Sequence, residues 1–150
     1  MAGKPEVIVL EEHFHLPEVN DLYPPADKNT NPALVAQLND LGAGRIAEMD
    51  KHGIDIAVLS HTAPAMQKMD AATAIKAATL ANDRLAEAVR ANPDRFRGFA
   101  VIPTPDPQAA ANELERAVTK LGFVGAMVHG LTNGEFLDRK KFWPIFERAE

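Results

Sequence analysis

Carboxylate and imidazole side chains gather in one short segment of the sequence, Glu11-Glu12-His13-Phe14-His15. Side chains alternate along a strand, so Glu11, His13 and His15 would project to one side and Glu12 to the other. A carboxylate oxygen and an imidazole nitrogen at this spacing can both bind one divalent ion. The spacing permits a metal site at Glu11 and His13. A strand end that runs into solvent is the competing interpretation, because short His and Glu patterns recur by chance.

Two more histidines follow apolar runs further along the chain. His61 comes after the run that ends at Ser60, and His129 ends a later run before Gly130. Parallel α/β folds build their sites at the carboxyl ends of the strands, so we expect His15, His61 and His129 at one edge, where they could contact a substrate. The competing interpretation for each is an ordinary surface histidine. His52 stands apart near a helix end, where a cation is favourable without any function.

The elements that would position these residues are read from apolar patterning. Four short, nearly continuous apolar runs predict strands at 7–10, 54–60, 96–102 and 123–129. Such runs are typical of a parallel sheet that is covered on both faces. Amphipathic patterns with capping residues predict four helices, at 31–53, 70–92, 106–122 and from 138 onward.

Strand and helix alternate four times along the chain. This order predicts an α/β fold with right-handed parallel crossovers, either a barrel or an open sheet. The irregular stretch 15–30, which directly follows the first strand, is long enough to predict a functional loop. The sequence stops at Glu150 inside its last amphipathic pattern. We therefore expect residues 1–150 to be the N-terminal half of a larger, truncated domain.

Composition excludes several classes of protein. The chain is 46% hydrophobic, which suits one domain with a real core, and its formal net charge of -5 argues against a nucleic-acid partner. It has no cysteine, so its metal ligands must be His, Asp or Glu, and a reducing cytoplasm is the expected location. Its apolar runs are too short for a signal peptide or a membrane span.

Several strings of the sequence carry a family resemblance. They are VLEEHF at 9–14, RIAEMDKHGI at 45–54, ANDRLA at 81–86, PDRF at 93–96, LGFVGA at 121–126 and FLDRKKFWPIFERA at 136–149. In this order the strings resemble the amidohydrolase-related decarboxylases, the family of γ-resorcylate, 2,3-dihydroxybenzoate and 5-carboxyvanillate decarboxylases. The resemblance covers nearly the whole chain.

The resemblance implies a TIM (β/α)8 barrel, of which this chain supplies about the first four βα units. It implies one divalent metal ion, Mn or Zn, with Glu11 and His13 as ligands. The wider superfamily uses a His-x-His pair in the first strand, which this chain also offers as His13 and His15, so the two ligand assignments compete. The remaining ligands and the catalytic acid and base would lie beyond residue 150. The isolated fragment is therefore expected to be inactive.

The reaction implied by the resemblance is a non-oxidative decarboxylation of a hydroxylated aromatic carboxylic acid. The metal would orient the carboxylate and the adjacent hydroxyl, and no organic cofactor is implied. The family resemblance also implies a homodimer or homotetramer. His61, and His129 where the family often has Asn before Gly, are departures that leave the particular substrate open.

Two alternative functions remain at the level of sequence. Related barrels hydrolyse or hydrate, so a metal-dependent hydrolase or hydratase is the nearest alternative. A non-catalytic α/β binding module, for a nucleotide for example, is the other. The first strand-to-helix connection argues against a nucleotide module, because it lacks the glycines that let a backbone approach phosphate.

Overall fold

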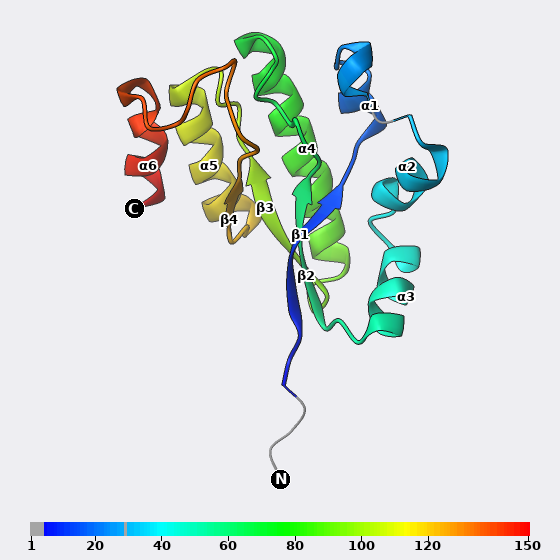
Figure 1. Cartoon of the computed structure of the whole chain (residues 1–150). Helices are drawn as coiled ribbons and strands as arrows, with labels where there is room; N and C mark the ends of the chain where they lie inside the picture. Colours follow the sequence, from blue (N-terminus) through cyan, green and yellow to red (C-terminus); the bar gives the residue numbers. More distant parts are fainter. Residues whose placement is uncertain (1–4, 29) are drawn as a thin grey trace.

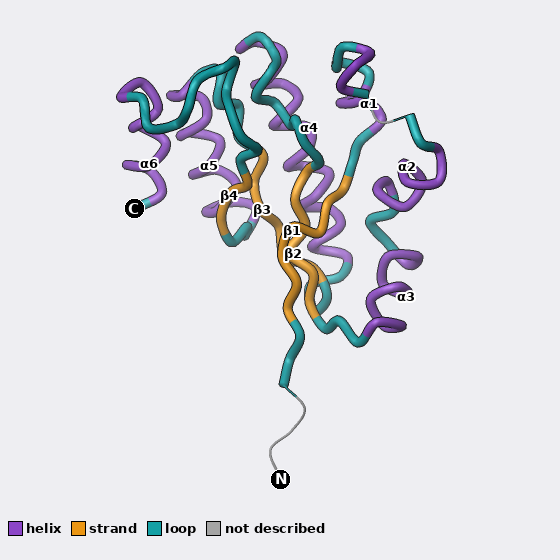
Figure 2. The backbone as a smooth tube through the Cα atoms, viewed as in Figure 1, coloured by secondary structure: helices purple, strands orange, loops and turns teal. Residues whose placement is uncertain are grey.

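The computed structural model describes residues 5–28 and 30–150. Its described residues form one four-stranded sheet in the order β1-β2-β3-β4, and each neighbouring pair is parallel. The strands are β1 (Ile8–Phe14), β2 (Ile56–His61), β3 (Phe96–Val101) and β4 (Gly125–Met127). Because every neighbouring pair is parallel, all carboxyl ends meet at one end of the sheet, where Figure 2 shows the loops that leave the strands.

Helices connect and cover these strands. They are α1 (Pro17–Asn20), α2 (Pro32–Asn39), α3 (Ala43–His52), α4 (Ala71–Ala91), α5 (Pro107–Leu121) and α6 (Trp143–Ala149), with short 3-10 turns η1 (Pro25–Asp27) and η2 (Lys140–Phe142). Figure 1 shows α4, α5 and α6 side by side in chain order, and α2 with α3 beyond β1. None of the helices in the described ranges is long and apolar enough to cross a bilayer.

The helices α4 and α5 begin where the sequence predicts. The Asp70 carboxylate accepts a hydrogen bond from Thr73 N at 3.0 Å, and Asp106 accepts one from Ala109 N at 3.0 Å. Each bond satisfies a backbone donor that the first helical turn leaves free. Alanines on the inner face of α4 allow close packing against the sheet. Gly98 in β3 is also closely packed, because an added Cβ would lie 2.7 Å from the Phe123 ring.

The prediction of one helix over 31–53 is wrong, because the chain breaks between α2 and α3. Asp40 has an extended ψ of 104°, and its carboxylate accepts from Gly42 N at 2.8 Å. Aspartate competes with the helical hydrogen-bond pattern in this way. Arg45 Nε donates to Asp40 O at 2.8 Å and holds the break in place.

The first strand is longer and less regular than predicted. It extends to Phe14 and contains a bulge, since Val9 pairs with Ala57 whereas Glu12 pairs with Leu59. One extra residue is therefore inserted in β1, and Glu11 takes a positive φ of 58° there. A bulge interrupts the alternation of side chains, so simple alternation does not relate Glu11 to His13 as the sequence argument assumed.

Further boundaries differ from expectation. The final α-helix begins at Trp143 after η2, not at 138, and β4 spans only Gly125–Met127. The stretch 15–30, predicted as irregular, contains α1 and η1, while residue 29 lies outside the described residues. Prolines at the start of α1, η1 and α6 explain why these short elements begin where they do, because proline suits a first helical turn.

Candidate metal centre

The carboxyl ends of β1 and β2 bring His13 and Ser60 together. The two residues are register partners, and His13 Nδ1 lies 2.9 Å from Ser60 Oγ. The segment after β4 adds His129, whose ring stands edge-on to the His13 ring with centroids 5.4 Å apart. Three separate strand ends thus contribute to one cluster, as parallel sheets require of their sites.

Hydrogen bonds hold both the ring and the backbone of His13. Its Nδ1 is engaged by Ser60, which leaves Nε2 as the ring nitrogen for a ligand. Its backbone carbonyl accepts from Arg45 Nη2 at 2.8 Å. Burial lowers the pKa of Arg45, and the neighbouring carboxylates of Glu12 and Asp40 act in the opposite direction. Arg45 therefore fixes the backbone of His13 against the break between α2 and α3.

Glu11 lies at the bulge with an exposed side chain. Its negative charge acts on His129, where it favours the protonated ring, while burial is the larger effect and lowers the pKa of His129. Glu11 is thus within electrostatic reach of the cluster. Across residues 5–28 and 30–150, no group of three or more His, Cys, Asp or Glu side chains is gathered closely enough to hold a metal ion.

These residues nevertheless suit a divalent ion chemically. Glu11 offers an oxygen donor, and His13 offers a nitrogen donor whose other nitrogen already has a hydrogen-bond partner. Both donor types bind manganese and zinc. The described residues therefore fit part of a metal-binding set rather than a complete one.

His129 is fixed by its backbone and by its ring. Its N–H donates to Gln67 Oε1 at 3.1 Å, and the amide of Gln67 donates back to His129 O. Its ring nitrogen Nε2 lies 2.8 Å from the backbone carbonyl of His61. A carbonyl oxygen only accepts, so the proton is on Nε2, and Nδ1 of the neutral ring carries a lone pair.

His61 and His15 form a second pair of rings next to this cluster. His61 pairs with Phe14 in the register, one position beyond Ser60 and His13, so its side chain is on the opposite face of the sheet. Its ring is edge-on to Phe14 at 5.2 Å and 6.1 Å from the ring of His15. Both histidines are buried, at 1% and 2% exposure. Of the three residues predicted to contact substrate, only His129 lies beside His13.

The Nδ1 atoms of both buried rings have partners, and their Nε2 atoms do not. His61 Nδ1 lies 3.0 Å from Thr62 O, and His15 Nδ1 lies 3.1 Å from Asn39 Oδ1. No partner is found for either Nε2 within the described part of the chain. Burial is the main reason that the pKa of His61 falls to about 4. The ring of His61 is therefore neutral at pH 7.

Sequence reasoning missed Gln67 and Arg45. Gln67 is 2% exposed and bonds a residue 62 positions along the chain. Arg45 reaches His13 across 32 positions. Neither residue lies at the end of a strand, so no local pattern marks it. Only the pairing of backbone groups in three dimensions reveals their roles.

Comparison with known proteins assigns the family. The sequence profile of the family described as Amidohydrolase matches residues 11–150. A γ-resorcylate decarboxylase from Rhodococcus jostii is 46% identical over 164 aligned residues, which cover 100% of this chain and 49% of the relative. The chain thus spans about half the length of the curated relatives it matches.

Solved structures support the same family assignment as the sequence relatives. A 5-carboxyvanillate decarboxylase from Novosphingobium aromaticivorans, with bound manganese, superposes with a TM-score of 0.90 at 36% identity and covers 96% of this chain and 47% of its own. A dihydroxybenzoic acid decarboxylase from Polaromonas, with bound manganese and 2-nitroresorcinol, gives 0.84 at 41% identity, with 97% and 46% covered.

These matches confirm the predicted α/β class and the TIM-barrel assignment, with about the first four βα units supplied here. The parallel order β1-β2-β3-β4 is the order of consecutive units in such a barrel. The family model covers nearly the whole chain, including the segment with Glu11 and His13. The chain belongs to the amidohydrolase family.

Proposed function

We propose that this chain is part of a metal-dependent, non-oxidative decarboxylase of a hydroxylated aromatic carboxylic acid. One observation carries the proposal: the whole chain aligns, at 46% identity, with a relative named γ-resorcylate decarboxylase. The solved relatives named above also carry names of aromatic acid decarboxylases. The cluster at the carboxyl ends of the strands is where such a fold places its chemistry.

The proposed metal ligands from this chain are Glu11 and His13. Their donor types match a manganese or zinc site, and the two solved relatives contain manganese. When bound, a divalent ion polarises the oxygens of a bound acid and neutralises charge that develops on them. Two protein ligands hold an ion weakly, so the proposal requires further ligands from residues outside the cluster described here.

The chain's own residues would orient the substrate and its ligands. Ser60 fixes the ring of His13, and Arg45 fixes its backbone. His129 stands next to His13, and its neutral ring can accept a hydrogen bond from a phenolic hydroxyl. The His61 side chain lies on the opposite face, and the ring of His15 lies 6.1 Å from the ring of His61, so we assign both to the surroundings of the site rather than to direct contact. The proton for the ring carbon of the substrate has no assigned donor among these residues.

The substrate class follows from the relatives. The Polaromonas structure holds 2-nitroresorcinol, and the Novosphingobium structure holds a hydroxy-methoxy-nitrobenzoic acid. Each is a small ring with a hydroxyl beside a planar, oxygen-bearing group. A dihydroxybenzoate is therefore the first substrate to test, with ring hydroxyls near the carboxylate.

The test measures metal content and carbon dioxide release together, on the protein as its gene encodes it. Elemental analysis gives the metal per chain, and a panel of hydroxybenzoates that includes 2,6-dihydroxybenzoate gives the activity. We expect about one ion per chain in the wild type. Glu11→Gln and His13→Asn should lose both the ion and the activity. His52→Asn, which changes an exposed histidine on α3, is the matched control and should keep both.

Three results separate the alternatives. Metal bound without decarboxylation would favour a hydrolase or hydratase of the same family. A folded wild type without metal would favour a non-catalytic binding module. Decarboxylation that survives both Glu11→Gln and His13→Asn would remove these residues from the site. The cytoplasmic location and the homodimer or homotetramer remain predictions, and size measurement of the same preparation tests the second.

A further inference from the structure

We propose that His129 is the residue that selects hydroxylated rings, because its Nδ1 atom accepts a hydrogen bond from a hydroxyl group of the substrate. This inference rests on the proposed function and deepens it, since it assigns recognition of the hydroxyl to one atom of this chain. A ring of similar size that carries no hydroxyl donor would lose this contact and bind less tightly.

The hydrogen bond to His61 sets the tautomer of His129. Nε2 of His129 lies 2.8 Å from the backbone carbonyl of His61, at the end of β2. A carbonyl oxygen only accepts, so Nε2 carries the proton and Nδ1 of the neutral ring is an acceptor. The backbone carbonyl cannot rotate away as a side chain could. The ring therefore presents an acceptor, and not a donor, to a ligand that reaches Nδ1.

Nδ1 of His129 can be reached by a ligand. Within residues 5–28 and 30–150, the hydrogen bond of this ring is the one at Nε2. The buried side-chain atoms without a partner in those ranges are His15 Nε2, His61 Nε2 and the Tyr23 hydroxyl, so His129 Nδ1 is not enclosed as they are. Water can pair with Nδ1 until a substrate ring covers it. A ring without a donor would then leave the atom unpaired, which costs binding free energy.

The position of His129 puts this acceptor at the carboxyl ends of the strands, beside His13. The two rings stand edge-on with their centroids 5.4 Å apart. Parallel α/β barrels bind their substrates at this end of the sheet. A benzoate carries its carboxylate and its hydroxyls at different places on the ring, so one molecule can contact neighbouring side chains at separate points. Both histidines need only border the same site, and their nitrogens need not face one point.

Gln67 holds His129 in a fixed position. Its side chain is buried, accepts a hydrogen bond from the His129 N–H at 3.1 Å and donates one to the His129 carbonyl. We call these two hydrogen bonds the Gln67 anchor. A further bond joins the same segments, from Asn133 N to Gln67 O at 3.0 Å. An acceptor that is held in place cannot move to another partner when the substrate lacks a donor, so the anchor strengthens the selection.

The other histidines at this edge do not offer an equivalent atom. The Nε2 atoms of His15 and His61 are buried, so a ligand does not reach them. Nδ1 of His13 lies 2.9 Å from Ser60 Oγ, and its Nε2 is the atom proposed for the metal. Among these four histidines, His129 is the one with an accessible acceptor that no other role uses.

The test compares two benzoates of similar size, added to the labelled protein in the presence of Zn²⁺. 2,6-Dihydroxybenzoate has a hydroxyl donor on each side of its carboxylate, and 2,6-difluorobenzoate has none, so the result does not depend on which way round either ring binds. Long-range 1H–15N spectra report Nδ1 and Nε2 of each histidine. We expect 2,6-dihydroxybenzoate to shift His129 Nδ1 toward the position of a hydrogen-bonded acceptor, and 2,6-difluorobenzoate to shift it much less.

Calorimetry with the same two benzoates provides the second measurement. His129→Leu removes the acceptor, so the affinity for 2,6-dihydroxybenzoate should fall by about tenfold or more, and the affinity for 2,6-difluorobenzoate should change by less than about twofold. His52→Leu, which changes an exposed histidine on α3, is the matched control and should alter neither affinity.

The outcomes separate this inference from the proposed function. Equal losses of affinity for both benzoates in His129→Leu would overturn the selection by His129 and leave the proposed function in place. Binding of 2,6-dihydroxybenzoate to the wild type without a shift of His129 Nδ1 would do the same. If neither benzoate binds to the folded wild type, both the selection by His129 and the substrate class of the proposed function are wrong.

Discussion

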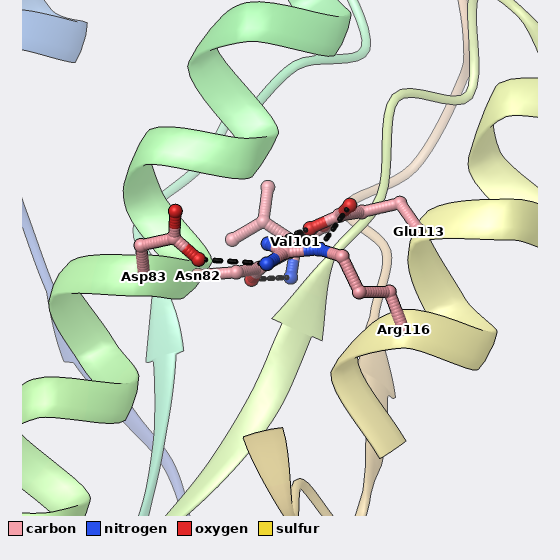
Figure 3. Close-up of polar contacts among 5 residues, drawn as sticks. All are labelled: Asn82, Asp83, Val101, Glu113 and Arg116. Atoms are coloured by element: carbon pink, nitrogen blue, oxygen red, sulfur yellow. Dashed lines mark hydrogen bonds and ion pairs between the residues drawn. The ribbon is translucent and has the colours of Figure 1, made fainter. Parts of the chain in front are cut away.

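Two buried polar regions of this molecule differ in whether their hydrogen-bonding groups have partners. In the first, Asn82 on α4 is fully buried, and its amide pairs with the backbone of Val101 in β3. Asn82 Nδ2 donates to Val101 O at 2.8 Å, and Val101 N donates to Asn82 Oδ1 at 2.9 Å. The same Nδ2 donates to Glu113 on α5 at 2.7 Å. Figure 3 shows these contacts converging on the end of β3.

This first region continues outward until it reaches solvent. Arg116 donates to both oxygens of Glu113 and to Asp83, at distances between 2.7 and 2.9 Å. The hydrogen bonds of Glu113 raise the pKa of Arg116, and those of Asp83 add to the effect. The region therefore joins α4, α5 and β3 through polar groups that all have partners. Its role is to hold the helices on the sheet.

The second region is the set of histidines at the strand ends. His15 and His61 are buried, yet their Nε2 atoms have no partner among the described residues. Buried polar atoms without partners cost free energy, so a protein retains them where another requirement outweighs stability. We infer that the Asn82 region stabilises the fold, and we propose that the histidine region contributes to the site. Substitutions should separate the two roles.

The largest expected effect is the loss of the Asn82 amide. Asn82→Leu has a similar shape but leaves Val101 N–H and C=O without the group that pairs with them. We expect the free energy of unfolding to fall by about 3 kcal/mol, measured by urea denaturation. Asn112→Leu on the exposed face of α5 is the matched control and should change it by less than about 0.5 kcal/mol. Equal effects at the two positions would contradict a structural role for the buried amide.

Gln67 should give a smaller loss of stability and a clear effect on the site. Gln67→Met keeps the length of the side chain but removes both hydrogen bonds to His129. We expect a loss of about 1 to 2 kcal/mol, because His129 is only half-buried and water can replace part of the pairing. Carbon dioxide release from 2,6-dihydroxybenzoate should fall as well, because His129 is a proposed substrate contact, whereas Asn82→Leu should leave it nearly unchanged in the folded protein.

The control for this prediction is Gln108→Met on the exposed face of α5. It should alter neither stability nor carbon dioxide release. If Gln67→Met reduced stability but left carbon dioxide release intact, the hydrogen bonds of Gln67 to His129 would have a purely structural role, like those of Asn82. The Asn82 region and the Gln67 anchor would then both have a structural role.

Tyr23 provides the smallest effect at neutral pH and a test of the unpartnered groups. Its hydroxyl is buried without a partner in the described ranges, and burial followed by the charge of Asp27 raises its pKa above the ordinary 10.0. Tyr23→Phe should therefore change stability at pH 7 by less than about 1 kcal/mol. Above pH 10 the unfolded chain loses this proton first, so wild-type stability should fall by up to about 1.4 kcal/mol per pH unit.

The chain has one tyrosine, so its ultraviolet absorbance reports the ionisation of Tyr23 alone. The alkaline loss that is specific to Tyr23 is the difference between wild type and Tyr23→Phe, which removes contributions from other groups. A tyrosine that ionises near pH 10 in the folded protein would show that its hydroxyl is not isolated from solvent. A large loss of stability in Tyr23→Phe at pH 7 would reveal a partner for the hydroxyl.

The sequence alone determined the class of fold and the place of the candidate site. Apolar runs followed by capped helices predicted the strands and the helices α4 and α5, because burial patterns and caps such as Asp70 and Asp106 are local features. The position of Glu11 and His13 directly after an apolar run predicted the edge of the sheet where the cluster lies. Patterning of this kind depends only on neighbouring residues, so it survives without knowledge of contacts.

Tertiary structure alone decided which of the candidate residues meet. The break at Asp40 and the bulge at Glu11 were not predictable, because the break is held by a hydrogen bond from Arg45 in α3 and the bulge lies in the pairing of β1 with β2. The register placed His13 beside Ser60 and the His61 side chain on the other face, and the segment after β4 brought the ring of His129 to the ring of His13. Gln67 and Arg45 gained their roles from backbone groups far along the chain, since hydrogen bonds form between atoms that folding brings close.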